Sequence, residues 1–62
     1  MNEEQCISMD SNILLSIVNM KLRDFYSDLD SLCDDMEIRQ EVLIQKMNNI
    51  GYKYDKDINQ FR

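Results

Sequence analysis

Apolar residues recur at helical spacing through three segments of the chain, which are residues 12–26, 28–36 and 40–49. In the first segment they follow steps of four, four and three, which place them on one face of a helix. The expected core residues are Leu14, Val18, Leu22 and Phe25, then Leu29, Leu32, Cys33 and Met36, then Leu43, Met47 and Ile50. The pattern predicts three short helices, and a tight turn at residues 37–39 joins the last two as in a helix-turn-helix pair.

Polar residues mark the ends of these predicted helices. Asp10 or Ser11 can accept a hydrogen bond from a free backbone N–H and so begin the first helix. Ser27 and Asp30 have the spacing of a capping box ahead of the second helix. Gly51 follows the third helix, where a residue in the left-handed conformation commonly ends the helix.

The C-terminal residues have the pattern of a β-hairpin. Tyr52 and Tyr54 share one face of an extended strand, residues 55–57 are turn-like, and residues 59–61 can return as the second strand. A two-stranded hairpin is marginal alone, so we expect its aromatic side chains to pack on the helices. The expected fold is therefore mainly α, a three-helix, helix-turn-helix-like bundle with a small C-terminal β-hairpin, as in a miniature winged helix.

The start of the chain shows no such period. We expect a flexible N-terminal arm over residues 1–11 and a single domain over residues 12–62. A domain this small buries only about 60% of its unfolded surface, so such domains often rely on a disulfide, a metal or a partner chain. We expect Cys6 and Cys33 to be reduced thiols, with Cys6 on the loose arm and Cys33 in the core.

A second apolar stripe lies on the first predicted helix. Ile13, Ile17 and Met20 fall at helical steps, but their stripe is centred more than about 100° from the expected core face. One small domain cannot easily bury both faces, and exposed apolar patches tend to mark interfaces. We therefore expect a protein partner or a second copy of the chain to bind this stripe. The alternative is that Ile7 and Met9 fold back and cover it.

Charge is distributed unevenly along the chain, which has a net charge of −5. Residues 1–38 carry −7 and residues 39–62 carry +2. If the chain binds DNA, the third helix would enter the major groove. The candidate nucleic-acid contacts are then Arg39, Gln40 and Gln45 on that helix and Lys53 and Lys56 on the hairpin. The aspartates of the second helix would repel phosphate, so a small DNA-binding regulator is the alternative hypothesis.

The residues that carry common enzyme chemistry are largely missing. The chain has no histidine and two cysteines, so the usual base for a nucleophile and the ligands for a thiolate zinc site are absent. Gly51 is its one glycine, which excludes a glycine-rich phosphate loop. The aspartates of the second helix are expected to form a solvated face. We expect no catalytic residues, no metal and no cofactor.

The chain also lacks the signals of a membrane or secreted protein. No apolar run approaches the roughly 18 residues that span a bilayer, and the acidic N-terminus is unlike a secretory signal. We therefore expect a cytoplasmic protein with no membrane partner.

Several ordered motifs resemble a family of short bacterial domains of unknown function. The motifs are residues 14–24 (LLSIVNMKLRD), 31–35 (SLCDD), 51–55 (GYKYD) and 59–61 (NQF). The resemblance covers most of residues 12–62. It implies a helix-turn-helix-like core with a C-terminal hairpin, and it implies no activity and no catalytic residues.

Overall fold

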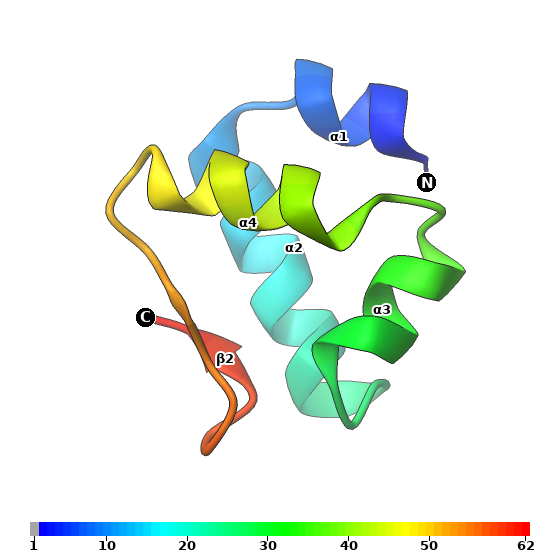
Figure 1. The fold of residues 1–62 in the computed structure, drawn as a ribbon, viewed down its shortest axis with the longest axis vertical. Coiled ribbons are helices and arrows are strands. Elements are labelled where there is room, and N and C mark those ends of the chain that lie inside the picture. The colour runs from blue at the N-terminus through cyan, green and yellow to red at the C-terminus, as the bar shows by residue number, and fades with distance from the viewer. Residues whose placement is uncertain (1) are drawn as a thin grey trace.

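The computed structural model describes residues 2–62, which form four helices followed by a two-stranded antiparallel hairpin (Figure 1). The elements are α1 (Glu3–Ser8), α2 (Ser11–Asp24), α3 (Leu29–Asp35), α4 (Gln40–Asn48), β1 (Tyr54–Asp55) and β2 (Gln60–Phe61). The mainly helical fold with a small C-terminal hairpin is confirmed. The described residues contain one helix more than the sequence predicts.

Helix α2 is the element on which the others are assembled. Figure 1 shows it at the back of the molecule, with α4 crossing in front of it, α3 on one side and the hairpin on the other. The long helix contacts α3, α4 and β2, so one face of α2 is buried by all three. The opposite face of α2 points away from α3, α4 and the hairpin.

Most of the buried core comes from the positions that the helical spacing predicts, and Cys6, Ile38 and Phe61 are added from α1, the α3–α4 turn and the hairpin. The side chains buried in it are Cys6, Leu14, Val18, Leu22, Leu29, Leu32, Cys33, Met36, Ile38, Leu43, Met47 and Phe61. The prediction was wrong for Phe25, which is 69% exposed, and Ile50 is only partly buried and lies outside the core cluster. Phe25 is the C-cap residue of α2 and has a φ of −125°, so the helix ends before it can complete the stripe.

Side-chain caps set the starts of two helices. The Asp10 carboxylate accepts hydrogen bonds from the N–H groups of Asn12 and Ile13, each at 3.1 Å, and so begins α2 as predicted. Helix α3 begins with Asp28, whose carboxylate accepts from the Ser31 N–H at 2.7 Å. The capping box predicted at Ser27 is therefore wrong by one residue.

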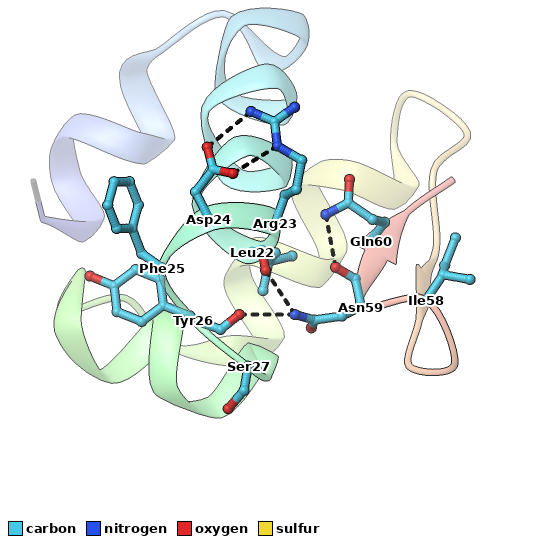
Figure 2. A pocket seen from close by; sticks show the side chains of 9 residues that line it. All are labelled: Leu22, Arg23, Asp24, Phe25, Tyr26, Ser27, Ile58, Asn59 and Gln60. Atoms are coloured by element: carbon cyan, nitrogen blue, oxygen red, sulfur yellow. Dashed lines mark hydrogen bonds and ion pairs between the residues drawn. The ribbon is translucent and has the colours of Figure 1, made fainter.

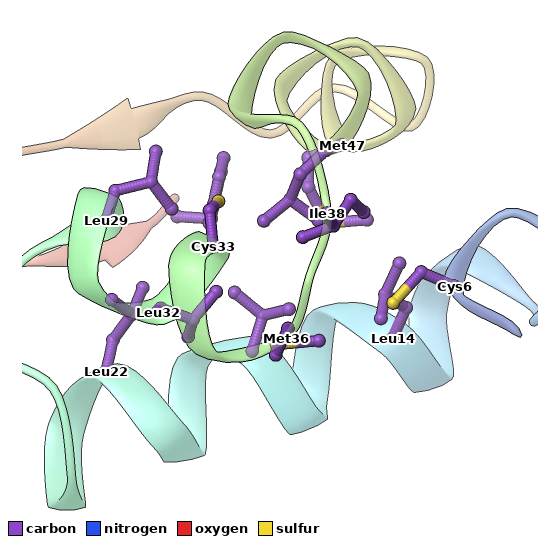
Figure 3. Close-up of a cluster of buried hydrophobic side chains, with 12 residues drawn as sticks. Cys6, Leu14, Leu22, Leu29, Leu32, Cys33, Met36, Ile38 and Met47 are labelled. Atoms are coloured by element: carbon purple, nitrogen blue, oxygen red, sulfur yellow. The ribbon is translucent and has the colours of Figure 1, made fainter. Parts of the chain in front are cut away.

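The predicted flexible arm is replaced by a helix over Glu3–Ser8. Asn2 and Gln5 form a reciprocal capping box, in which each side chain accepts from the other residue's backbone N–H. Cys6 is fully buried, and Figure 3 shows it beside Leu14 at the α1 end of the core. The expectation of a loose arm overlooked this cap, because the segment is too short to show a helical period.

Asparagine side chains fasten the hairpin to α2. The Asn19 amide pairs with both backbone groups of Phe61, donating to the carbonyl at 3.0 Å and accepting from the N–H at 2.8 Å. The Asn59 amide donates to the carbonyls of Leu22 and Tyr26 at the end of α2. Phe61 is buried in the core, and Tyr52 and Tyr54 pack against it, so the aromatic side chains of the hairpin contact the helical core as expected.

Candidate interaction surface

The second apolar stripe of α2 remains open to solvent. Ile13 is 57% exposed and Met20 is 36% exposed, whereas Ile17 between them is half-buried. These three residues lie one helical turn apart from one to the next, and we call them the outer face of α2. The Asp10 cap starts the helix early enough for Ile13 to lie in its first turn.

The N-terminal residues do not seal this outer face. Ile7 was the residue expected to fold back over it, but its side chain is itself 52% exposed. Ile7 lies instead beside α4, where Lys46 donates a hydrogen bond to its carbonyl at 3.0 Å. Met9 is partly buried against the core cluster. The alternative of a covered stripe is therefore wrong for Ile13, the most exposed of the three.

Arg39, a candidate base contact, is held by an acidic side chain of the same molecule. Its guanidinium donates to both carboxylate oxygens of Glu3, at 3.0 and 3.1 Å. The Arg39 N–H, at the start of α4, donates to the same carboxylate at 3.0 Å. These bonds keep the pKa of Glu3 below its ordinary value, because they favour the charged carboxylate. The Arg39 guanidinium and backbone N–H are thus both bonded to a carboxylate of the same molecule.

The other candidate nucleic-acid contacts are not gathered into one surface. Gln40 donates a side-chain hydrogen bond to Asp30 of α3, and Gln45 donates to Asn49 along α4 at 3.1 Å. Lys53 and Lys56 are exposed on the hairpin. Of the five, only Gln40 and Lys56 border the same depression, which also contains aspartates.

An open pocket lies between the end of α2 and the hairpin (Figure 2). Its polar groups are already used by the fold. Figure 2 shows the Asn59 amide bonded to the carbonyls of Leu22 and Tyr26. It also shows two nitrogens of the Arg23 guanidinium group bonded to the two carboxylate oxygens of Asp24. The Gln60 amide donates to the carbonyls of Asn19 and Asn59. The pocket therefore offers few free polar atoms to a substrate.

The two thiols are buried and lie in different parts of the core. Figure 3 shows Cys33 toward Leu29, away from Cys6, and both are free thiols. Burial raises the pKa of Cys33 to about 11, and the nearby Asp30 adds to this effect. Burial also raises the pKa of Cys6. Because the thiolate is the reactive form, neither side chain is suited to nucleophilic chemistry.

Two further features of residues 2–62 bear on the kinds of site present. The structure does not bring three or more metal-ligating side chains together in this part of the chain. None of its helices combines the length and the apolar character needed to cross a membrane.

The outer face of α2 is predictable from the sequence, whereas the ion pair between Arg39 and Glu3 was not predicted. The signal that could have revealed it is Asn2 followed three residues later by Gln5, the capping pattern that starts α1. Once α1 is helical, Glu3 lies in its first turn and reaches Arg39.

A family model described as "Domain of unknown function (DUF4250)" matches residues 8–61. The match includes α2, α3, α4 and the hairpin, and it leaves most of α1 outside. No curated protein and no solved structure matches the chain.

Proposed function

The chain belongs to the family described as "Domain of unknown function (DUF4250)", and we propose that it is a non-enzymatic module that self-associates through the outer face of α2. The observation that carries this proposal is the exposure of Ile13 and Met20 on the one long helix of the fold. Burying apolar surface is the main driving force of protein association, and it gains about 25 cal/mol for each Å² removed from water.

The surroundings of the stripe favour contact with another protein. The contacts that α2 makes with α3, α4 and β2 leave Ile13 and Met20 exposed among residues 2–62. A flat, uncovered helix face is accessible to a second helix, whereas a small molecule needs a concave site. A protein surface is therefore a better occupant than a ligand.

The rival hypothesis of DNA binding has less support. Arg39 and Gln40, the two residues best suited to reading bases, are both bonded to acidic side chains of the same molecule. A DNA phosphate would have to displace Glu3 and approach the aspartates of α3 at the same time. Each of these charges opposes phosphate, and the net charge of −5 opposes it at longer range.

Sedimentation equilibrium of two matched variants tests the proposal. Ile13→Lys places a charge on the outer face of α2, and Ile58→Lys makes the same change at a similarly exposed residue of the hairpin. We expect wild type and Ile58→Lys to associate as concentration rises to about 1 mM, and Ile13→Lys to remain monomeric. Circular dichroism checks that all three are equally helical.

Two results would overturn the proposal. One is a wild-type chain that stays monomeric over the whole concentration range. The other is equal association of all three proteins, which would place the contact elsewhere. Titration of mixed duplex DNA at physiological salt separates the rival, because a DNA reader would bind with an affinity that falls steeply as salt rises.

A further inference from the structure

We infer that α1 occupies a helix-binding groove beside α4, and that a partner protein binds there by presenting an acidic helix in place of α1. The groove extends from Arg39 at the start of α4 to Lys46 in its last turn, and we call it the α1 groove. It is a different surface from the outer face of α2 and is independent of the proposed self-association.

Three contacts hold α1 in this groove. The Glu3 carboxylate, in the first turn of α1, accepts hydrogen bonds from the guanidinium and the backbone N–H of Arg39. The Lys46 ammonium donates to the Ile7 carbonyl at 3.0 Å. Between these two contacts, Cys6 is fully buried and is the one buried residue of α1. Helix α1 therefore lies along α4 and runs in the same direction, as Figure 1 shows.

Helix α1 is built so that it can leave the groove as a unit. A capping box of Asn2 and Gln5 starts α1, whereas Asp10 caps α2 separately. The backbone of Met9 between them is extended, so a rotation there leaves the hydrogen bonds within both helices in place. The ion pair that holds α1 is accessible to water, since 67% of the Arg39 side chain is exposed, and exposed ion pairs contribute little to stability. We therefore expect α1 to open while the other helices stay folded.

The boundary of the family match separates the groove from the helix that covers it. Arg39 and Lys46 lie within the matched residues 8–61, as does Leu14, which Figure 3 shows beside Cys6. Glu3 and Cys6 lie outside the match. The groove therefore belongs to the family domain, and the contacts that cover it come from a segment before it.

The contacts of α1 define the chemistry of a helix that fits the groove. Its first turn carries a carboxylate, because Arg39 presents two guanidinium N–H groups and a backbone N–H to the same acid. Three positions later it carries a small apolar residue, because Cys6 fills a closed space at the edge of the core. A phosphate could accept the same hydrogen bonds, but it offers no apolar side chain for that space. A protein helix is therefore the better occupant.

A partner helix has room for contacts that α1 does not make. An open depression adjoins the groove and is lined by Ile7 together with Val42 and Lys46 of α4. Ile7 is 52% exposed at the edge of this depression, so α1 covers only part of the apolar surface beside α4. A longer helix with a larger apolar residue at this position would bury more area and would compete with α1.

Competition with α1 regulates access to the groove. A short connection holds α1 near the groove at an effective concentration on the order of mM. A partner helix binds only to the open state, so its apparent affinity is reduced by the fraction of chains that are open. Changes that weaken the docking of α1 should therefore strengthen the binding of an added helix.

A synthetic peptide of residues 2–10, acetylated and amidated at its ends, tests the groove in the full chain. We titrate it into the ¹⁵N-labelled Glu3→Arg variant, in which Arg39 repels the chain's own α1. We expect the amide peaks of Leu14, Arg39 and Lys46 to move and to saturate. Glu4→Arg is the matched control, because Glu4 is exposed on the same helix. Its α1 stays docked, so we expect the peptide to bind it about tenfold more weakly.

Variant peptides show which features of the helix are recognised. We expect a peptide with Glu3→Arg to bind about tenfold more weakly than the natural peptide, because it loses the charge-assisted bonds to Arg39. A peptide with Cys6→Asp should also bind more weakly, since a carboxylate is costly to bury in the apolar space. Glu3→Gln is a second open variant of the chain, with no added charge, and should bind the natural peptide more tightly than wild type does. Circular dichroism checks that every chain variant is folded.

Three results would overturn the assignment of the groove. One is a peptide that binds neither open variant while both stay folded. Another is equal binding of the natural and the Glu3→Arg peptides. The third is association of the wild-type chain that Glu3→Arg abolishes, because the helix would then come from a second copy. The first two results leave the proposed self-association through the outer face of α2 untouched, and a monomeric wild-type chain would overturn that proposal without affecting the groove.

Discussion

Glu37 and Asn59 share a rare backbone conformation for different reasons. Both have a positive φ, 55° for Glu37 and 53° for Asn59, a region in which non-glycine residues are disfavoured by about 1–2 kcal/mol. The Asn59 side chain offsets this cost by donating to the carbonyls of Leu22 in α2 and of Tyr26 just after it. Glu37 is exposed in the turn between α3 and α4 and makes no side-chain hydrogen bond with the described residues. The sequence predicts a turn at Glu37 but not its positive φ; both of its neighbours, Met36 and Ile38, are buried in the core.

Glycine substitutions at these two residues should therefore have opposite effects. We expect Glu37→Gly to raise the free energy of unfolding by about 0.5–1 kcal/mol, because glycine adopts positive φ without strain. Asn59→Gly should lower it by about 1–2 kcal/mol, because the carbonyls of Leu22 and Tyr26 lose their donor. Urea denaturation of both variants measures the difference, and a loss of stability in Glu37→Gly would show that its conformation is not strained.

The buried Cys33 thiol makes stability depend on pH in the alkaline range. Its pKa is about 11 in the folded chain, against an ordinary value of 9.0. A raised pKa means that folding favours the neutral thiol, so the contribution is complete below pH 9 and is lost as pH rises through 11. We expect the free energy of unfolding to fall between pH 9 and 11, and to fall less steeply in Cys33→Ala. Equal slopes for the two proteins in urea denaturation would contradict this assignment.

At the scale of elements, helical spacing and capping residues predict the longer helices, whereas features that depend on tertiary contacts were missed. The three longer helices, the turn and Gly51, which has a φ of 85°, agree with the prediction to within two residues at each end. Helix α1 was missed because six residues carry less than two turns of pattern. The pairing of Asn19 with Phe61 was also missed, because a polar residue shows no sign of a partner 42 residues away.

The docking of α1 should depend on the Glu3–Arg39 ion pair. Glu3→Gln weakens the charge-assisted bonds to Arg39, so we expect α1 to detach more often and the buried Cys6 to become accessible. Alkylation by iodoacetamide should then speed up at Cys6 and stay unchanged at Cys33, as read by mass spectrometry. Glu4→Gln is the matched control, since Glu4 is exposed on the same helix and has no ion pair within residues 2–62. Equal labelling in the two variants would show that the ion pair does not hold α1.

At the scale of the whole molecule, one small core accounts for both the stability of the chain and its open surface. Helices α3 and α4 and the hairpin all pack against one side of α2, and the elements of residues 2–62 leave Ile13 and Met20 exposed. The sequence predicted this outer face because its stripe is centred far from the core stripe on the same helix. It could not show that Arg39 is bonded to Glu3, which weakens the case for DNA binding.

The most direct test of the account is a dilution series of amide ¹H–¹⁵N spectra from about 1 mM downwards. We expect the peaks that move with concentration to belong to the outer face of α2, that is Ile13, Ile17 and Met20, while those of α4 and the hairpin stay fixed. Peaks that move on α4 or the hairpin instead, or a spectrum that does not change with concentration, would contradict it.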